Sequence, residues 1–129
     1  MSRATSVYSF VCAAFAAGVV GLATAGCFSE RVAAPGGPSA QELCDGTQAN
    51  VVRIRNYAFG PAELRVPRGT TVTWANCDND THTSTSDNGV WDSGAMTPIT
   101  KYERRFDTPG TFPYHCNPHP GMQARIVVE

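Results

Sequence analysis

The segment with the clearest chemistry lies near the C-terminus and reads Tyr-His-Cys-Asn-Pro-His-Pro-Gly-Met over residues 114–122. It places a thiol, an imidazole and a thioether at the spacing Cys-x2-His-x2-Met, in Cys116, His119 and Met122. A tight loop can turn all three side chains toward one point. A thiolate is a soft ligand that suits Cu(I), whereas imidazole accepts both oxidation states of copper. These ligand types together favour a copper site.

A trigonal copper site with two histidines, one cysteine and a weak axial methionine needs one further imidazole. His82 supplies it, from a loop just after the strand expected around residues 72–74. The third histidine, His115, directly precedes Cys116, and strand alternation sends its side chain to the opposite face. The sequence therefore predicts one copper ion with four ligands: His82, Cys116, His119 and Met122.

Short strands separated by turns are the elements expected to position these ligands. Apolar and polar residues alternate, as in strands with one buried face, in the segments 52–55, 71–75, 112–116 and 126–128. Turn sequences with Gly, Pro or Asn lie at 59–61, 67–69, 87–89 and 108–110. Closely spaced short strands without a helical pattern predict an all-β antiparallel sandwich or barrel.

Several of these segments, taken in order, resemble the plastocyanin/azurin class of cupredoxins over residues 56–129, particularly its amicyanin- and pseudoazurin-like members. The spacing Cys-x2-His-x2-Met, with a proline on each side of His119, is similar to that of amicyanins. The other matching motifs are Phe-Gly-Pro at 59–61, Val-Pro-Arg-Gly at 66–69, Val-Thr-Trp-Ala-Asn at 72–76, Asp-Thr-Pro-Gly-Thr-Phe at 107–112 and Tyr-His-Cys at 114–116.

This resemblance implies a Greek-key β-sandwich of about eight strands, with a type 1 (blue) copper ion near one end and electron transfer as the activity. His82 and His119 would be the equatorial nitrogen ligands, Cys116 the thiolate and Met122 the axial sulfur. Many relatives have Asn or Ser after the first histidine, where hydrogen bonds brace the two ligand loops. This chain has Thr83 there, whose hydroxyl can still bridge the loops.

Residues 1–26 are predicted to form an export signal. One basic residue precedes an uncharged apolar run at 7–23, and small residues follow it. If the sequence Ala-Gly-Cys at 25–27 is the end of a bacterial lipobox, Cys27 is lipidated and becomes the new N-terminus. The alternatives are cleavage after Ala25 with simple secretion, and an uncleaved anchor, since about 17 to 25 apolar residues can span a bilayer.

Residues 27–43 follow as a predicted flexible tether, because they contain Pro, Gly, Ser and Ala with little apolar content and no periodicity. The folded copper domain is expected over residues 44–129. A domain of this size is marginal in stability by itself, so a cross-link or a bound metal would help it.

The five cysteines of the chain predict such a cross-link by elimination. Cys12 lies in the leader; if Cys27 is lipidated and Cys116 binds copper, Cys44 and Cys77 are left as one pair. In an exported domain, two such thiols are expected to form a disulfide. This disulfide would join the start of the domain to the loop that leads to the first histidine ligand. The alternative is that Cys77 is an additional metal ligand.

Charge and histidine content argue against two classes of function. The formal net charge is −1 and the ten basic residues are scattered, which disfavours nucleic-acid binding. Three histidines are too few for a multicopper enzyme, so the protein is predicted not to be an enzyme. The leading hypothesis is a monomeric one-electron carrier between redox partner proteins in the bacterial cell envelope, in the periplasm or at the cell surface, tethered to the membrane as a lipoprotein. The alternative is copper storage, delivery or sensing without an obligatory redox partner.

Overall fold

A computed structural model of the chain describes residues 37–129. The predicted signal at 1–26 and the predicted lipidation site Cys27 lie outside the described residues. Among the residues described, no helix is long and apolar enough to cross a membrane.

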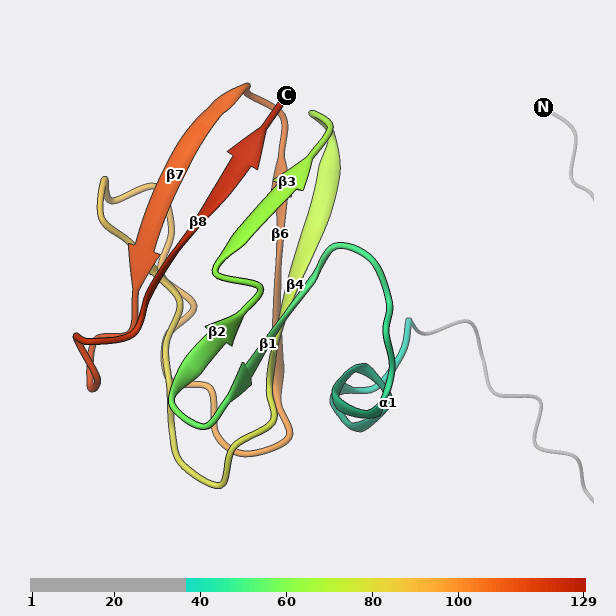
Figure 1. Cartoon of the computed structure of the whole chain (residues 1–129), viewed down its shortest axis with the longest axis vertical. Coiled ribbons are helices and arrows are strands. Elements are labelled where there is room, and N and C mark those ends of the chain that lie inside the picture. Colours follow the sequence, from blue (N-terminus) through green and yellow to red (C-terminus); the bar gives the residue numbers. More distant parts are fainter. Residues whose placement is uncertain (1–36) are drawn as a thin grey trace, which may run out of the picture. The chain divides into compact units, whose positions relative to one another are not determined.

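Residues 37–129 form one short helix followed by eight strands (Figure 1). Their bounds are α1 (Ala40–Asp45), β1 (Val51–Arg55), β2 (Ala58–Gly60), β3 (Glu63–Val66), β4 (Thr70–Asn76), β5 (Thr85–Ser86), β6 (Lys101–Phe106), β7 (Gly110–His115) and β8 (Gln123–Val128).

The strands of this part of the chain form two four-stranded sheets with the orders β2-β1-β4-β6 and β3-β8-β7-β5. This confirms the predicted all-β sandwich of about eight strands. The sheets are mixed rather than purely antiparallel, because β1 pairs with β4 and β3 pairs with β8 in parallel. Parallel neighbours need a crossover connection. The chain provides one between β1 and β4, since it passes through the hairpin strand β2 and then through β3 of the other sheet.

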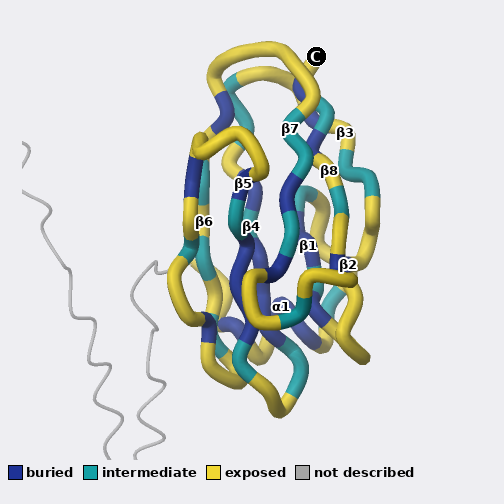
Figure 2. Tube along the Cα trace, turned by 90° about the vertical axis from the view of Figure 1, so that its left-hand side faces the viewer, coloured by how far each residue is buried: buried dark blue, intermediate teal, exposed yellow. Residues whose placement is uncertain are grey.

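The core lies between the two sheets. Figure 2 shows the buried stretches of the strands in dark blue. Val52 and Trp74 are opposite each other on β1 and β4, and both are fully buried. The Trp74 ring packs edge-on against Tyr114 of the facing sheet, with 5.6 Å between ring centroids, and near Trp91 at 5.7 Å. The alternation of apolar residues predicted these buried faces.

Helix α1 occupies the end of the segment that was predicted as a flexible tether. A capping box starts the helix: the Ser39 hydroxyl accepts from the Glu42 N–H, and the Glu42 carboxylate accepts from the Ser39 N–H. Leu43 and Cys44 are buried against Val51 and Ala75. The tether prediction is therefore wrong for residues 40–43, which belong to the folded part of the chain because the helix buries an apolar side.

Candidate metal centre

The loop between β7 and β8 carries three of the predicted ligands, and two consecutive turns shape it. The Cys116 carbonyl accepts from the His119 N–H at 3.2 Å, and the His119 carbonyl accepts from the Met122 N–H at 2.9 Å. The Cys116 N–H closes the loop by donating to the Met122 carbonyl at 3.1 Å. Pro120 occupies the second position of the second turn, where its fixed φ is favourable. The spacing of two residues between successive ligands thus places Cys116, His119 and Met122 at the ends of the two tight turns.

The fourth predicted ligand, His82, is held by a backbone bridge to Met96. His82 and Met96 exchange two N–H···O hydrogen bonds of 3.1 and 2.8 Å. The buried side chain of Asn76 fixes the preceding loop, because its amide donates to the Asp80 carbonyl at 2.7 Å and to the Met96 carbonyl at 2.9 Å. His82 is fully buried as a result.

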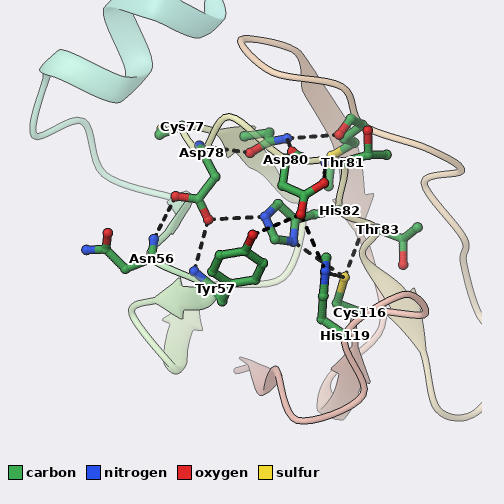
Figure 3. Close-up of polar contacts among 12 residues, drawn as sticks. Asn56, Tyr57, Cys77, Asp78, Asp80, Thr81, His82, Thr83, Cys116 and His119 are labelled. Carbon is green, nitrogen blue, oxygen red and sulfur yellow. Dashed lines mark hydrogen bonds and ion pairs between the residues drawn. The ribbon is translucent and has the colours of Figure 1, made fainter.

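The two loops bring two imidazole nitrogens to one sulfur (Figure 3). The Nδ1 atoms of His82 and His119 each lie 3.6 Å from the Cys116 Sγ, and the three possible ligand atoms lie within 4.8 Å of one another. Ligand atoms at about 2.0–2.3 Å from one shared metal ion are separated by about 3.5–4 Å, so this donor set fits a single ion. Met122 is buried in the same loop.

Thr83 connects the two ligand loops. Its N–H donates to the Cys116 Sγ at 3.3 Å, and its hydroxyl oxygen accepts from the Asn117 N–H at 2.8 Å. Thr83 therefore bridges the loops through its hydroxyl, as expected from the sequence. The two backbone segments on either side of the sulfur are fixed relative to each other by this residue.

The far edge of each imidazole faces a carboxylate. The His82 Nε2 lies 3.1 Å from the Asp78 Oδ2, and the His119 Nε2 lies 3.7 Å from the Asp80 Oδ2. The Tyr57 ring packs edge-on against both imidazoles, with centroid distances of 5.4 Å to His82 and 4.9 Å to His119. Its hydroxyl donates to the Asp80 Oδ2 at 2.9 Å.

Tyr57, Asp78 and Asp80 are site residues that were not predicted from the sequence. The only signal is that both aspartates lie within four residues before His82. Hydrogen bonds from the Thr81 N–H and then from the Tyr57 hydroxyl lower the pKa of Asp80, and the same Asp80 contact raises the pKa of Tyr57. Asp80 is therefore a stable anion beside the second imidazole.

His115 lies outside this cluster, as strand alternation predicts. Its Nδ1 is paired with the Asp87 carboxylate, and its Nε2 lies 3.0 Å from the Asn117 Oδ1. The hydrogen bond to Asp87 raises the pKa of His115. The neighbouring Cys116, by contrast, is fully buried and points into the core.

Two further cysteines are joined in a disulfide. Cys44 and Cys77 are 33 residues apart in sequence, and their Cα atoms lie 5.6 Å apart. In this arrangement Cys77 has no thiolate to offer a metal. Cys116 is the free cysteine within residues 37–129.

A β-sandwich that gathers two imidazoles and one buried thiol at one end defines a small metal-binding domain with a single mononuclear site. The chain belongs to the plastocyanin/azurin family of copper-binding proteins, whose family model matches residues 47–129. Its cofactor is one copper ion, and the family implies copper-based electron transfer. The resemblance identified from the sequence is therefore confirmed.

Individual relatives agree with this assignment. Amicyanin of Paracoccus denitrificans is 38% identical over 96 residues, which are 70% of this chain and 72% of that protein. The solved structure of a reduced amicyanin mutant has a TM-score of 0.62 at 35% identity, and the match covers 70% of this chain and 90% of that one. A purple cupredoxin from Nitrosopumilus maritimus has a TM-score of 0.59 at 27% identity, covering 64% of this chain and all of that one.

Proposed function

We propose that this protein carries single electrons between redox partner proteins in a bacterial cell envelope. One observation carries the proposal: two Nδ1 atoms lie 3.6 Å from a fully buried thiol at one end of the sandwich. The bound copper supplies a one-electron couple between Cu(II) and Cu(I). His82, Cys116 and His119 would hold it, with Met122 of the same loop as the axial ligand.

The ligand loops suit electron transfer because hydrogen bonds within the protein hold them in place. The two turns at 116–122 and the Thr83 bridge restrain the backbone on both sides of the sulfur. Ligands that are already ordered need little rearrangement when the charge of the metal changes, just as preorganised groups lose little entropy on binding. The side chain of His119 is 28% exposed while that of His82 is buried, so His119 offers the path for electrons to a partner.

The absorption spectrum of the oxidised, copper-loaded protein tests the proposed copper site. The wild-type protein should be intensely blue because of charge transfer between the Cys116 thiolate and Cu(II). Cys116→Ser should abolish this colour and leave a folded sandwich. His115→Asn is the matched control, because His115 adjoins the thiol in sequence but lies outside the cluster; it should stay blue. A blue Cys116→Ser protein would contradict the ligand assignment.

The axial position has its own test. Met122→Gln should keep the blue colour and lower the reduction potential, because an amide oxygen is a harder donor than a thioether and favours Cu(II). Voltammetry measures the potential. Met96→Leu is the control, since it alters the other buried methionine of the described residues and should leave the potential unchanged. An unchanged or raised potential in Met122→Gln would argue against Met122 as a ligand.

Electron carriage is favoured over copper delivery and over an enzyme. A buried, braced site releases its metal slowly, whereas delivery needs facile loss to an acceptor. Residues 37–129 contain a single cluster of possible metal ligands of the His, Cys and carboxylate types. Fast self-exchange of electrons, together with slow copper loss to a chelator, would support the carrier; rapid loss would support delivery.

The location in the cell envelope is inferred from two features. The apolar run at 7–23 followed by small residues is typical of an export signal. A disulfide such as Cys44–Cys77 persists in oxidising compartments outside the cytoplasm. Both features agree with an exported copper domain.

A further inference from the structure

The two predicted histidine ligands both direct Nδ1 toward the sulfur and Nε2 toward an aspartate, but the two carboxylates are held differently. The Asp78 Oδ2 lies 3.1 Å from the His82 Nε2, and the side chains are 13% and 0% exposed. The Asp80 Oδ2 lies 3.7 Å from the His119 Nε2, and the side chains are 50% and 28% exposed. Only the Asp78 pair is within hydrogen-bond distance and shielded from water.

The Asp78 carboxylate is fixed by the turn between β1 and β2 (Figure 3). Its Oδ1 accepts from the Asn56 N–H at 2.7 Å and its Oδ2 accepts from the Tyr57 N–H at 2.9 Å. Both turn residues have positive φ, 51° and 57°, which turns their N–H groups to the same side. The Asp78 N–H in turn donates to the Asn76 Oδ1 at 3.0 Å. The carboxylate is therefore anchored independently of any metal.

A fixed carboxylate determines which nitrogen of His82 carries the proton. An ionised carboxylate only accepts hydrogen bonds, so the neutral His82 ring satisfies Asp78 by carrying its hydrogen on Nε2. The lone pair then lies on Nδ1, the atom that faces the Cys116 sulfur. Some histidines bind a metal through one nitrogen and donate a hydrogen bond from the other nitrogen to a carboxylate. The carboxylate fixes the orientation of such a ring and makes its metal-binding nitrogen more basic.

We propose that Asp78 is a positioning residue of the copper site, which fixes the tautomer and orientation of His82 and lowers the reduction potential of the metal. The second effect follows because a nearby negative charge and a more basic imidazole both stabilise Cu(II) more than Cu(I). The proposal rests on the proposed role of His82 as a ligand. It gives the turn at residues 56–57, far from His82 in sequence, a direct part in tuning the metal.

Asp78→Asn removes the charge and one acceptor while keeping the size of the side chain. The amide has one acceptor oxygen for three N–H groups, and its NH2 group can donate to Nε2 and so stabilise the tautomer with hydrogen on Nδ1. Asp80→Asn is the matched control. It removes the same charge from the same loop, but the Asp80 Oδ2 already accepts from the Tyr57 hydroxyl and lies beyond hydrogen-bond distance of His119.

The experiment compares the wild-type chain with both variants in three measurements. Nitrogen-15 NMR of the copper-free protein, with His82 neutral, should show the Nε2–H tautomer in wild type and a population of Nδ1–H in Asp78→Asn only. Competition with a chelator should show Cu(II) affinity reduced about 10- to 100-fold in Asp78→Asn. Voltammetry should show a raised potential, by about 59 mV for each tenfold loss of Cu(II) affinity relative to Cu(I).

Three results would overturn the proposal: an Nδ1–H tautomer of His82 in copper-free wild type, an Asp78→Asn protein with wild-type tautomer and potential, or an equal rise of potential in Asp80→Asn. If Asp78→Asn does not fold, the tautomer of His82 in the wild-type protein tests the proposal by itself, because the hydrogen bond to Asp78 requires the hydrogen on Nε2. A wild-type protein that binds no copper would instead contradict the proposed function. If the wild type is blue and Asp78→Asn keeps the wild-type tautomer and potential, this inference is contradicted and the proposed function is not.

Discussion

Thr83, which directly follows His82, connects its own loop to the Cys116 loop through two hydrogen bonds. Its hydroxyl accepts from the Asn117 N–H, and it lies 3.0 Å from the Thr85 hydroxyl. Its backbone N–H reaches the Cys116 sulfur. Because the residue is buried, both contacts are shielded from competing water.

Thr83→Val should loosen this connection while preserving side-chain shape. We expect a loss of about 1 kcal/mol in the free energy of unfolding of the copper-free protein, the usual net value of one hydrogen bond. Copper should be lost faster to a chelator, with little change of colour, because the N–H to the sulfur remains. Thr83→Ser keeps the hydroxyl and should behave like wild type. Equal stability and equal copper loss in Val and Ser variants would show that the bridge contributes nothing.

Residue types and spacing were enough to predict the cluster of His82, Cys116 and His119, because a thiol and an imidazole with two residues between them leave few other roles. The carboxylates behind the imidazoles could not be predicted in this way. Whether Asp78 or Asp80 faces His82 depends on the path of the intervening loop, and the buried Asn76 amide sets that path through two carbonyl groups. No local pattern encodes such a contact.

At the scale of elements, helix α1 depends on its connections to the sheet. A six-residue helix is too short to be stable alone. The Arg53 Nε donates to the Leu43 carbonyl at 2.6 Å, and the Arg55 guanidinium donates to the Cys44 carbonyl. The disulfide to Cys77 adds a covalent link to the loop that leads to His82.

Cys44→Ala/Cys77→Ala should therefore free the helix and destabilise the domain. Opening a loop closed by residues 33 apart should cost about 3–4 kcal/mol in the free energy of unfolding. The copper-free protein should melt at a lower temperature and the loaded protein should lose copper faster, with little change of colour. Thiol counting in denaturant is the direct check. Reactive Cys44 and Cys77 thiols in unreduced wild type would show that no disulfide is present.

The neighbouring strands β3 and β8 of the second sheet are joined by an ion pair. This pair predicts that the stability of the domain depends on pH. Arg125 donates from Nε to the Glu63 Oε2 at 2.6 Å, and Arg65 lies 2.9 Å from the other carboxylate oxygen. These contacts, the Arg125 hydrogen bond first, lower the pKa of Glu63 below its ordinary value of 4.5. A lowered pKa in the folded state gives stability above the ordinary value, which is lost as the pH falls through the folded-state value.

Glu63→Gln should accordingly be less stable than wild type at neutral pH, and the difference should disappear on acidification below pH 4.5. Because the pair is exposed, we expect a small effect. Urea unfolding of the copper-free proteins at a series of pH values measures it. A difference that stays constant across the acid range would mean that the glutamate acts through packing rather than charge.

The strands themselves were largely predictable, whereas their pairing was not. Alternation of apolar residues at 52–55 and 71–75 corresponds to β1 and β4. Nothing in either segment indicates that the two lie side by side in parallel, because that pairing is decided by the crossover through the other sheet. Helix α1 had a signal in its capping box, Ser-Ala-Gln-Glu at 39–42, but it is too short to show a helical period.

At the scale of the whole molecule, Cys27 is predicted to anchor the protein to a membrane. The mature protein should partition into membranes, and Cys27→Ala should release it or block its processing. Mass spectrometry of the mature N-terminus is decisive: two or three acyl chains on Cys27 support the anchor. An N-terminus at an unmodified Gly26 would rule it out in favour of simple secretion.

The position of β8 also governs the order in which the molecule can be completed. This last strand lies in the interior of its sheet, between β3 and β7, and aligns Leu64 with Ile126 and Phe112 with Ile126. A growing chain therefore cannot close its second sheet until β8 has left the ribosome. Such non-local pairing makes folding slow. Slow closure of this sheet agrees with the export proposed above, in which an unfolded chain would cross the membrane and its copper loop would assemble afterwards.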